Sequence, residues 1–282
     1  MQMRKLALRG MEFGLIEAGS TEGPPLVLLH GWQDQAAIWV PFIQALLQHA
    51  PHRIVAMDLR GFGQSEHNAP GSAYAFAEYL VDLDHLLDHY PGPVTLVAHS
   101  MGGTIASLYA GLRPERVARL VLVDGLGIPD GLDGTVHRMR EHLDGYKNVL
   151  PHKVFTSVED MAHRLMRANA GLSRDHAQML AERVSVRTEA GWIWRWDPRH
   201  RVRLAVPYRQ DQHLRVLAEI TAPTLLVVPE RVGFPVEDLE RLAAAIRHVQ
   251  RRQLADCGHM LHVEQPEALA AAVHGFLFPD RG

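Results

Sequence analysis

The sequence predicts an α/β protein whose eight strands form a mostly parallel sheet flanked by helices. Short apolar runs, typical of strands that are buried on both faces, alternate with stretches whose apolar residues recur at helical spacing. Alternation of this kind predicts a parallel sheet with right-handed crossover connections. Between about residues 128 and 215 the alternation stops, which predicts an insertion of a different character.

In the first part of the chain, Gly10 separates two short strands, and a turn from Gly19 to Pro25 precedes the third. That third strand, Leu26 to Leu29, is continuously apolar, as expected for a fully buried strand. An amphipathic helix, another apolar strand and a helix with apolar residues at helical spacing follow. These elements are predicted at residues 3–9, 11–17, 26–29, 39–49, 53–57 and 75–89.

The same pattern then continues on either side of the insertion. Only a short turn around Ser100 separates the next strand from the next helix. A further apolar strand ends directly before Asp124. After the insertion, two strands and two helices complete the sheet and its cover. These elements are predicted at residues 94–98, 104–111, 117–123, 223–228, 236–247, 249–254 and 266–278.

The insertion carries helical patterns over residues 136–150, 158–170 and 175–186, with no convincing buried strand. Three tryptophans alternate near its end, at Trp192, Trp194 and Trp196. We interpret the insertion as a helical cap. The predicted domains are therefore a core formed by residues 1–127 and 216–282 and a cap formed by residues 128–215.

The predicted cap is more basic than the rest of the chain. Residues 125–215 hold 15 Lys and Arg against 11 Asp and Glu, a net charge of +4. A basic cap above a site would favour an anionic substrate. A solvated face whose arginines pair locally, at Arg199, Arg201 and Arg203, explains the same charges more simply.

Composition excludes several classes of protein. A hydrophobic fraction of 47%, a charged fraction of 22% and a net charge of −3 are ordinary for a globular protein, so neither nucleic acid nor a membrane surface is an expected partner. We expect no signal peptide and no membrane span, because no apolar segment is long enough. The single cysteine, Cys257, excludes internal disulfides. These observations favour a cytoplasmic location and leave the oligomeric state open.

No cofactor or metal is expected. The pairs His85/His89 and His259/His262 lack nearby third and fourth ligands for a zinc site. The run Gly61-Phe62-Gly63 is a weak hint of phosphate binding, but neither G-K-[ST] nor G-x-G-x-x-G occurs in the chain. Asp58 and Arg60, beside this run, are expected to be structural.

The motif with the clearest chemistry is Ala98-His99-Ser100-Met101-Gly102, at the tight turn between a strand and a helix. It is the nucleophile elbow G-x-S-x-G with alanine in the first position. So tight a turn strains the residue at its apex and needs small neighbours, which Gly102 and Gly103 supply. Strand, turn and helix follow in the order that the elbow requires.

The elbow and three further motifs, which follow one another in the same order as in the α/β-hydrolase superfamily, make the chain resemble that superfamily over essentially its full length. A weaker similarity links residues 191–199 to bacterial serine-hydrolase-like members. The motifs are His30-Gly31-Trp32, Asp58-x-Arg60-Gly61-x-Gly63-x-Ser65, the elbow with Gly103, and Gly258-His259-Met260-Leu261-His262-x-Glu264-x-Pro266.

The resemblance implies that Ser100 is the nucleophile and that the backbone N–H groups of Trp32 and Met101 form an oxyanion hole. A serine hydroxyl needs a base to accept its proton as it attacks. The superfamily's chain order places that base after the last strand, where His259 stands. His99, although adjacent to Ser100, is expected to point elsewhere.

The triad acid is the uncertain member. Its usual place after the strand at 223–228 holds Glu230 and no aspartate. Some members carry the acid after the strand that follows the elbow helix, where this chain has Asp124. Asp124 would lie at the carboxyl edge of the sheet, where open α/β sheets form their sites. We favour Asp124 and keep Glu230 as the alternative.

The expected function is hydrolysis of a small to medium carboxylic ester by a Ser100–His259–Asp124 triad, without a cofactor. A serine at the elbow argues against epoxide hydrolases and haloalkane dehalogenases, which need a carboxylate nucleophile. Thioesterase, amidase, lactonase and C–C hydrolase activities use the same triad and stay open. Two alternatives remain: a cofactor-free oxygenase or lyase in which a His–Asp pair acts as base, and a ligand-binding receptor that retains the triad.

Overall fold

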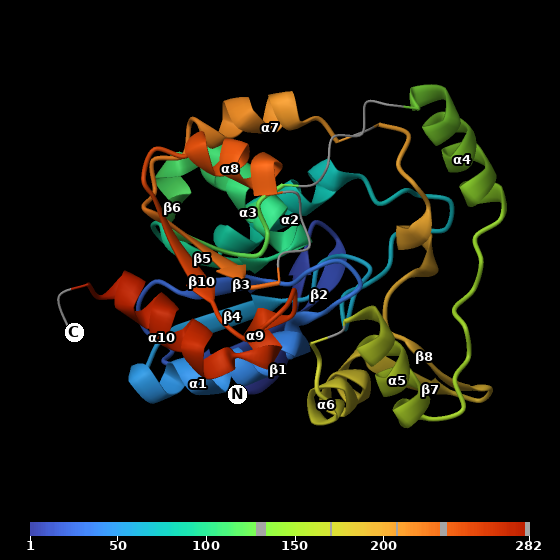
Figure 1. Cartoon of the computed structure of the whole chain (residues 1–282). Coiled ribbons are helices and arrows are strands. Elements are labelled where there is room, and N and C mark those ends of the chain that lie inside the picture. The colour runs from blue at the N-terminus through green and yellow to red at the C-terminus, as the bar shows by residue number, and fades with distance from the viewer. Residues whose placement is uncertain (128–133, 170, 207, 232–235, 280–282) are drawn as a thin grey trace.

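A computed structural model describes residues 1–127, 134–169, 171–206, 208–231 and 236–279 (Figure 1). Its centre is an eight-stranded sheet. The first two pairings, β1 with β2 and β2 with β4, are antiparallel, and the remaining neighbours are parallel. The order across the sheet is β1 (Gln2–Leu8), β2 (Met11–Gly19), β4 (Arg53–Met57), β3 (Leu26–Leu29), β5 (Val94–His99), β6 (Val117–Val123), β9 (Thr224–Pro229) and β10 (Val249–Leu254).

Helices cover both faces of this sheet (Figure 1). On one face α1 packs against α10, and the short helix α9 precedes α10. On the other face α3 packs against α2 and α7, beside α8. These helices are α1 (Val40–His49), α2 (Phe76–Leu87), α3 (Met101–Leu112), α7 (Gln210–Leu217), α8 (Val236–Ala244), α9 (Leu261–Glu264) and α10 (Pro266–Leu277).

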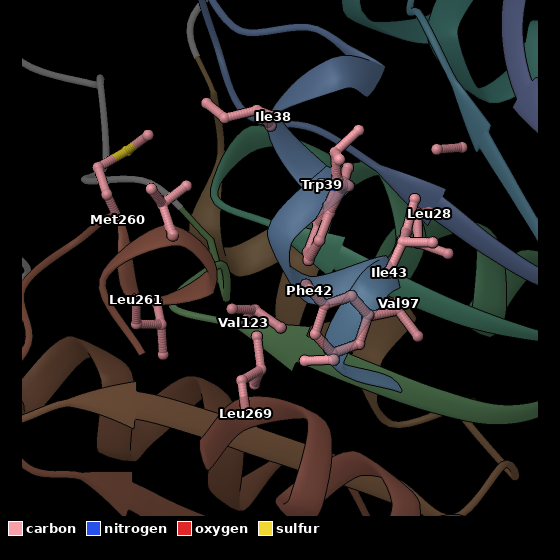
Figure 2. Close-up of a cluster of buried hydrophobic side chains, with 14 of the residues drawn as sticks. Leu28, Ile38, Trp39, Phe42, Ile43, Val97, Val123, Met260, Leu261 and Leu269 are labelled. Carbon is pink, nitrogen blue, oxygen red and sulfur yellow. The ribbon is translucent and has the colours of Figure 1, made fainter. Parts of the chain in front are cut away.

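Burial on both faces explains the continuous apolar strands. Leu28 points into a cluster with Trp39 and Phe42, whereas its neighbours Val27 and Leu29 point into the cluster on the opposite face. Figure 2 shows the first cluster, in which Leu28 and the helix residues lie together with Leu261 and Leu269 from the C-terminal part. A strand between two helical layers has no solvent-facing side, so its sequence shows no alternation.

The predicted sheet is confirmed: all eight strands are present, with ends within two residues of the predicted ones. The elbow helix begins earlier than predicted, at Met101 directly after Ser100. A short separate helix that was not predicted, α9 (Leu261–Glu264), precedes the C-terminal helix.

Between β6 and α7 the structure describes a stretch over residues 134–206, except residue 170. This stretch is here called the insert. Its described residues contain three α-helices, as predicted, together with a short 3-10 helix (Pro198–Arg201) and an antiparallel hairpin that were not predicted. Figure 1 shows these elements to one side of the sheet. They are α4 (Thr135–Lys147), α5 (Val158–Ala168), α6 (Arg174–Val184), β7 (Ser185–Thr188) and β8 (Gly191–Trp194).

The alternating tryptophans explain the hairpin. Trp192 and Trp194 recur at the period of a strand, and every residue of β8 is only half-buried, so β8 is not one of the fully buried strands that the sequence analysis identifies. The division into core and cap stays a prediction. The predicted start of the cap, at residue 128, and the predicted end of one of its helices, at residue 170, lie outside the described residues. None of the helices in the described ranges has the length and apolar character to span a bilayer.

Candidate active site

The sharp turn between β5 and α3 holds Ser100 in a strained backbone conformation. Its φ of 51° and ψ of −120° lie where L-residues are rarely found. The glycines that follow let the chain pass close to its neighbours. A Cβ on Gly102 would lie 2.6 Å from the carbonyl oxygen of Leu29, and one on Gly103 would overlap the carbonyl oxygen of Gly125. Small residues here are therefore a packing requirement of the turn.

Gly103→Ala should lower the free energy of unfolding by about 1–3 kcal/mol, since the added methyl group meets backbone that cannot move away easily. Chemical denaturation followed by circular dichroism measures this change. Gly275→Ala is the matched control, because a Cβ at Gly275, an exposed helical position, meets nothing within 4 Å. Alanine there should leave stability unchanged or raise it by up to about 1 kcal/mol. Equal stability of Gly103→Ala and wild type would contradict this account of the turn.

Ser100, His259 and Asp124 form a continuous chain of hydrogen-bonding groups. Each follows the carboxyl end of a parallel strand, so the three meet at one edge of the sheet. The Nε2 atom of His259 is 3.1 Å from the Oγ of Ser100. The Nδ1 atom of His259 lies 2.7 Å from Oδ2 of Asp124. Because a carboxylate only accepts, Nδ1 carries the proton, which leaves Nε2 free to accept one from Ser100.

The members of this hydrogen-bonded series differ in how far they are buried. The Asp124 side chain is 8% exposed and that of His259 is 45% exposed. Burial lowers the pKa of His259, but the hydrogen bond to Asp124 and its negative charge outweigh it, so the net pKa lies above the usual histidine value. Asp124 has a positive φ, 43°, a conformation uncommon outside glycine. The imidazole therefore has a fixed orientation and a strengthened basicity.

Glu230, the alternative acid, is engaged elsewhere. Its Oε2 accepts a hydrogen bond of 2.9 Å from the backbone N–H of Asp256. The carboxylate therefore supports the loop that follows β10, whereas Asp124 contacts the ring of His259. Geometry favours Asp124 as the partner of His259.

The loop that carries His259 is anchored on both sides. The N–H of Gly258 donates to Oε2 of Glu264, at 3.1 Å, and the Glu264 side chain is only 4% exposed. On the other side Met260 and Leu261 are buried, in the cluster drawn in Figure 2. His259 therefore stands on a loop held by hydrogen bonds and by the core.

His99 is a support that the sequence did not predict. Its side chain bonds to His259 and not to Ser100, and its ring lies 4.6 Å from that of His259, measured between centroids. Its Nε2–H donates to the backbone carbonyl of His259, at 2.8 Å. His99 is 1% exposed, and burial, followed by repulsion from His262, holds its pKa well below the usual range. A neutral His99 thus fixes the backbone of His259 rather than reacting.

The two predicted oxyanion donors flank Ser100. Met101 is the first residue of α3, so its N–H is among those that a helix leaves without an internal acceptor. Trp32 follows β3 and lines the same cavities as Ser100. In the described part of the chain, neither backbone N–H has a recorded acceptor. Both groups are available to a negatively charged oxygen.

The other motif residues stabilise the turns around the site. Asp58 accepts hydrogen bonds from the backbone N–H groups of Ala36, at 2.6 Å, and Gln64, at 2.8 Å. Arg60 forms a buried, two-pronged pair with Asp82. Asp58 and Arg60 therefore have the structural contacts that the sequence predicts.

One group of side chains, two of them buried and one half-buried, has the spacing of a possible metal site. Potential ligand atoms of Asp34, His99 and His262 all lie within 4.8 Å of one another. Both ring nitrogens of His262 and Nδ1 of His99 are buried without a hydrogen-bond partner among the described residues. These residues are far apart in sequence, so spacing could not reveal the group. Burial raises the pKa of Asp34 to about 7, an effect that His259 partly opposes.

Two cavities meet at Ser100. One, of about 460 Å³, is bordered by the insert and includes Asp34 and His99. The other, of about 590 Å³, is largely apolar and is lined by residues such as Leu126 and Leu239. Ser100 and His259 line both cavities. A molecule bound at Ser100 has space to extend into either cavity.

Comparisons with known proteins agree with this architecture. A family model described as the alpha/beta hydrolase fold matches residues 24–266. A "serine hydrolase-like protein" of Danio rerio is 29% identical, over 93% of this chain and 83% of its own length. A "putative carbamate hydrolase RutD" of Caulobacter vibrioides is 28% identical, over 93% of each chain. The solved thioesterase domain from the curacin biosynthetic pathway has a TM-score of 0.86 and 30% identity, covering 97% of this chain and 99% of that one.

Proposed function

The chain belongs to the α/β hydrolase family, and on that premise we propose that it is a serine hydrolase acting on small to medium carboxylic esters. The observation that carries the proposal is the hydrogen-bonded series from Ser100 through His259 to Asp124. A serine hydroxyl becomes an effective nucleophile when a neutral imidazole, oriented by a carboxylate, accepts its proton.

In the first half of the reaction, Ser100 Oγ attacks the ester carbonyl carbon while its proton passes to Nε2 of His259. The carbonyl oxygen becomes negatively charged and accepts hydrogen bonds from the N–H groups of Trp32 and Met101. Loss of one such donor costs about 3–4 kcal/mol in other hydrolases. The carbon–oxygen bond to the alcohol then breaks, and His259 returns the proton to the departing oxygen.

In the second half, water takes the place of the alcohol. His259 accepts a proton from the water as its oxygen attacks the acyl group on Ser100. The tetrahedral intermediate uses the same oxyanion donors, and its collapse frees the acid and restores the Ser100 hydroxyl. Asp124 stays ionised throughout and stabilises the imidazolium that forms twice in each cycle.

A thioester is a second candidate substrate. The structural similarity to a thioesterase domain, at 30% identity, favours it. The same residues would act on a thioester, with a thiol as the leaving group. Carbamate hydrolysis, named for the Caulobacter vibrioides relative, would likewise begin with acyl transfer to a serine.

A panel of p-nitrophenyl esters with acyl chains of increasing length, run beside matching thioesters, tests the proposal. We expect hydrolysis by the wild-type protein and loss of hydrolysis in Ser100→Ala. Hydrolysis that survives this substitution would contradict the proposal. Oxygen consumption on an aromatic hydroxy-ketone, unaffected by Ser100→Ala, would favour the oxygenase alternative, and ligand-dependent thermal stabilisation without turnover would favour the receptor.

The rate should also depend on pH through His259. A protonated His259 cannot accept the proton of Ser100, so kcat/KM should fall as pH falls through the pKa of His259. Because that pKa is raised above the ordinary value of 6.5, the midpoint of the acid limb should lie above 6.5. In Asp124→Asn the fall of the residual kcat/KM with falling pH should occur at lower pH than in wild type. The reason is that this variant lacks the carboxylate that raises the pKa of His259.

Asp34 also titrates close to neutrality, and Asp34→Asn separates the two groups. The limb should persist in Asp34→Asn when kcat/KM is measured from pH 5 to pH 9, because the titrating base is His259. Disappearance of the limb in this variant would assign it to Asp34 and contradict the prediction.

A further inference from the structure

The cavity between Ser100 and the insert collects positive charge. Lys153, Arg164 and Arg201 line the same 460 Å³ space as Ser100 and His259. Among the described residues that line it, Asp34 is the only acidic one. In a cleft with partly apolar walls, charges of one sign reinforce one another and attract ions of the opposite sign.

These three cations differ from their basic neighbours in the insert. Arg199 pairs with Asp197, and Arg203 pairs with Glu141 at 2.7 Å, as expected for a solvated face with local pairing. Arg201 instead donates to the backbone carbonyl oxygens of Leu150 and Pro151. Local pairing therefore accounts for Arg199 and Arg203, whereas Arg201 has no acidic partner in the described part of the chain.

Lys153 and Arg164 likewise have no carboxylate partner among the residues that the structure describes. Lys153 lies over the ring of Phe155, with its Nζ 5.3 Å from the ring centroid, which orients the ammonium group without neutralising it. The cavity therefore holds three cations, all from exposed residues, against the single carboxylate of Asp34.

We infer that this cavity is a subsite for a carboxylate group, and that the substrate is an ester with one anionic arm and one apolar arm. The inference rests on the proposed function, because Ser100 would attack the ester carbon between the two arms. The anionic arm enters the space lined by Lys153, Arg164 and Arg201. The apolar arm enters the second cavity, beside Leu126 and Leu239.

Two pairs of esters, equal in shape and different in charge, test the inference. p-Nitrophenyl hydrogen glutarate against the p-nitrophenyl ester of glutaramic acid places the charge on the acyl side. The butyrate ester of p-hydroxybenzoate against that of p-hydroxybenzamide places it on the alcohol side. In one pair or both, the kcat/KM ratio of charged to uncharged ester should be about 10 or more, and higher salt should lower it.

The double variant Lys153→Gln/Arg164→Gln should lower this ratio about 10-fold. Arg167→Gln is the matched control, because Arg167 is an exposed cation on the same helix as Arg164 but outside the cavity. The control should keep the wild-type ratio. A ratio of one or less in both pairs, or a ratio that the double variant leaves unchanged, would overturn the inference.

Binding to Ser100→Ala separates this inference from the proposed function. Isothermal titration of that variant with the same esters should give a Kd about 10-fold lower for the charged member of a pair. Tighter binding of the charged ester without turnover by wild type would uphold the subsite and contradict ester hydrolysis. Ser100-dependent hydrolysis with no preference in rate or binding would overturn the subsite alone.

Discussion

Ser100→Ala should lower kcat/KM for ester hydrolysis by about 10⁴-fold or more. Without the hydroxyl no acyl group can be transferred to the protein, and only the oxyanion donors and substrate binding remain to assist direct attack by water. The Nε2 atom of His259 lies 3.1 Å from the hydroxyl oxygen, and its Nδ1 atom lies 2.7 Å from Oδ2 of Asp124. Both His259 and Asp124 would therefore serve to activate this one oxygen atom. Initial rates at substrate concentrations well below KM measure the change.

Ser107→Ala is the control for this substitution. Ser107 is a buried serine on the same helix, and its hydroxyl bonds to the carbonyl of Thr104 and to His213, away from the site. Its loss should affect stability more than rate, with kcat/KM within about threefold of wild type. A comparable loss in both variants would show that the effect of Ser100→Ala is structural rather than catalytic.

Asp124→Asn should lower kcat by about 10⁴-fold, the size seen for this substitution in other Ser-His-Asp hydrolases. An asparagine amide can donate to Nδ1 of His259, which would put the ring proton on Nε2 and remove the lone pair that Ser100 needs. The negative charge that stabilises the imidazolium is lost as well. Single-turnover and steady-state rates at saturating ester measure the loss.

Glu230→Gln provides the comparison. Glu230 accepts its hydrogen bond from the backbone of Asp256 and has no recorded contact with His259, so kcat should change less than about threefold. A large loss in Glu230→Gln with a small one in Asp124→Asn would move the acid to Glu230. The two carboxylates are thus ranked by one pair of isosteric substitutions.

The sheet and the elbow could be predicted from sequence because each leaves a local signal. Strands covered on both faces, such as Leu26–Leu29, are continuously apolar. The turn at Ser100 needs small residues at fixed spacing, and Gly102 and Gly103 now have identified backbone neighbours that leave no room for a side chain. The spacing of these glycines around Ser100 is the local signal, although the backbone that crowds them, at Leu29 and Gly125, comes from distant segments.

Contacts between distant segments left no such signal. Asp124 and His259 are 135 residues apart. Sequence favoured Asp124 through chain order, its place at the carboxyl edge of the predicted sheet and the missing aspartate near Glu230, and not through any signal of the contact itself. The support of His259 by His99 joins residues 160 positions apart and uses a backbone carbonyl, which has no sequence signature. The grouping of Asp34, His99 and His262 has the same cause.

The insert shows a third limit. Its hairpin follows from the period of Trp192 and Trp194, yet neither strand is buried as the central strands of the sheet are, so the pattern is weak. Whether a basic residue pairs locally also depends on rotamers and neighbours. Arg199 finds Asp197 two positions away, whereas Arg201 points to backbone carbonyls and into the cavity.

Capture of the acyl group on Ser100 tests the central claim most directly. Wild-type protein mixed with a p-nitrophenyl ester and quenched within the first turnover should show, by mass spectrometry, the mass of one acyl group. Peptide mapping should place that group on Ser100, and Ser100→Ala should show none. Quenched protein without an acyl group while product forms, or an acyl group on another residue, would contradict catalysis by Ser100.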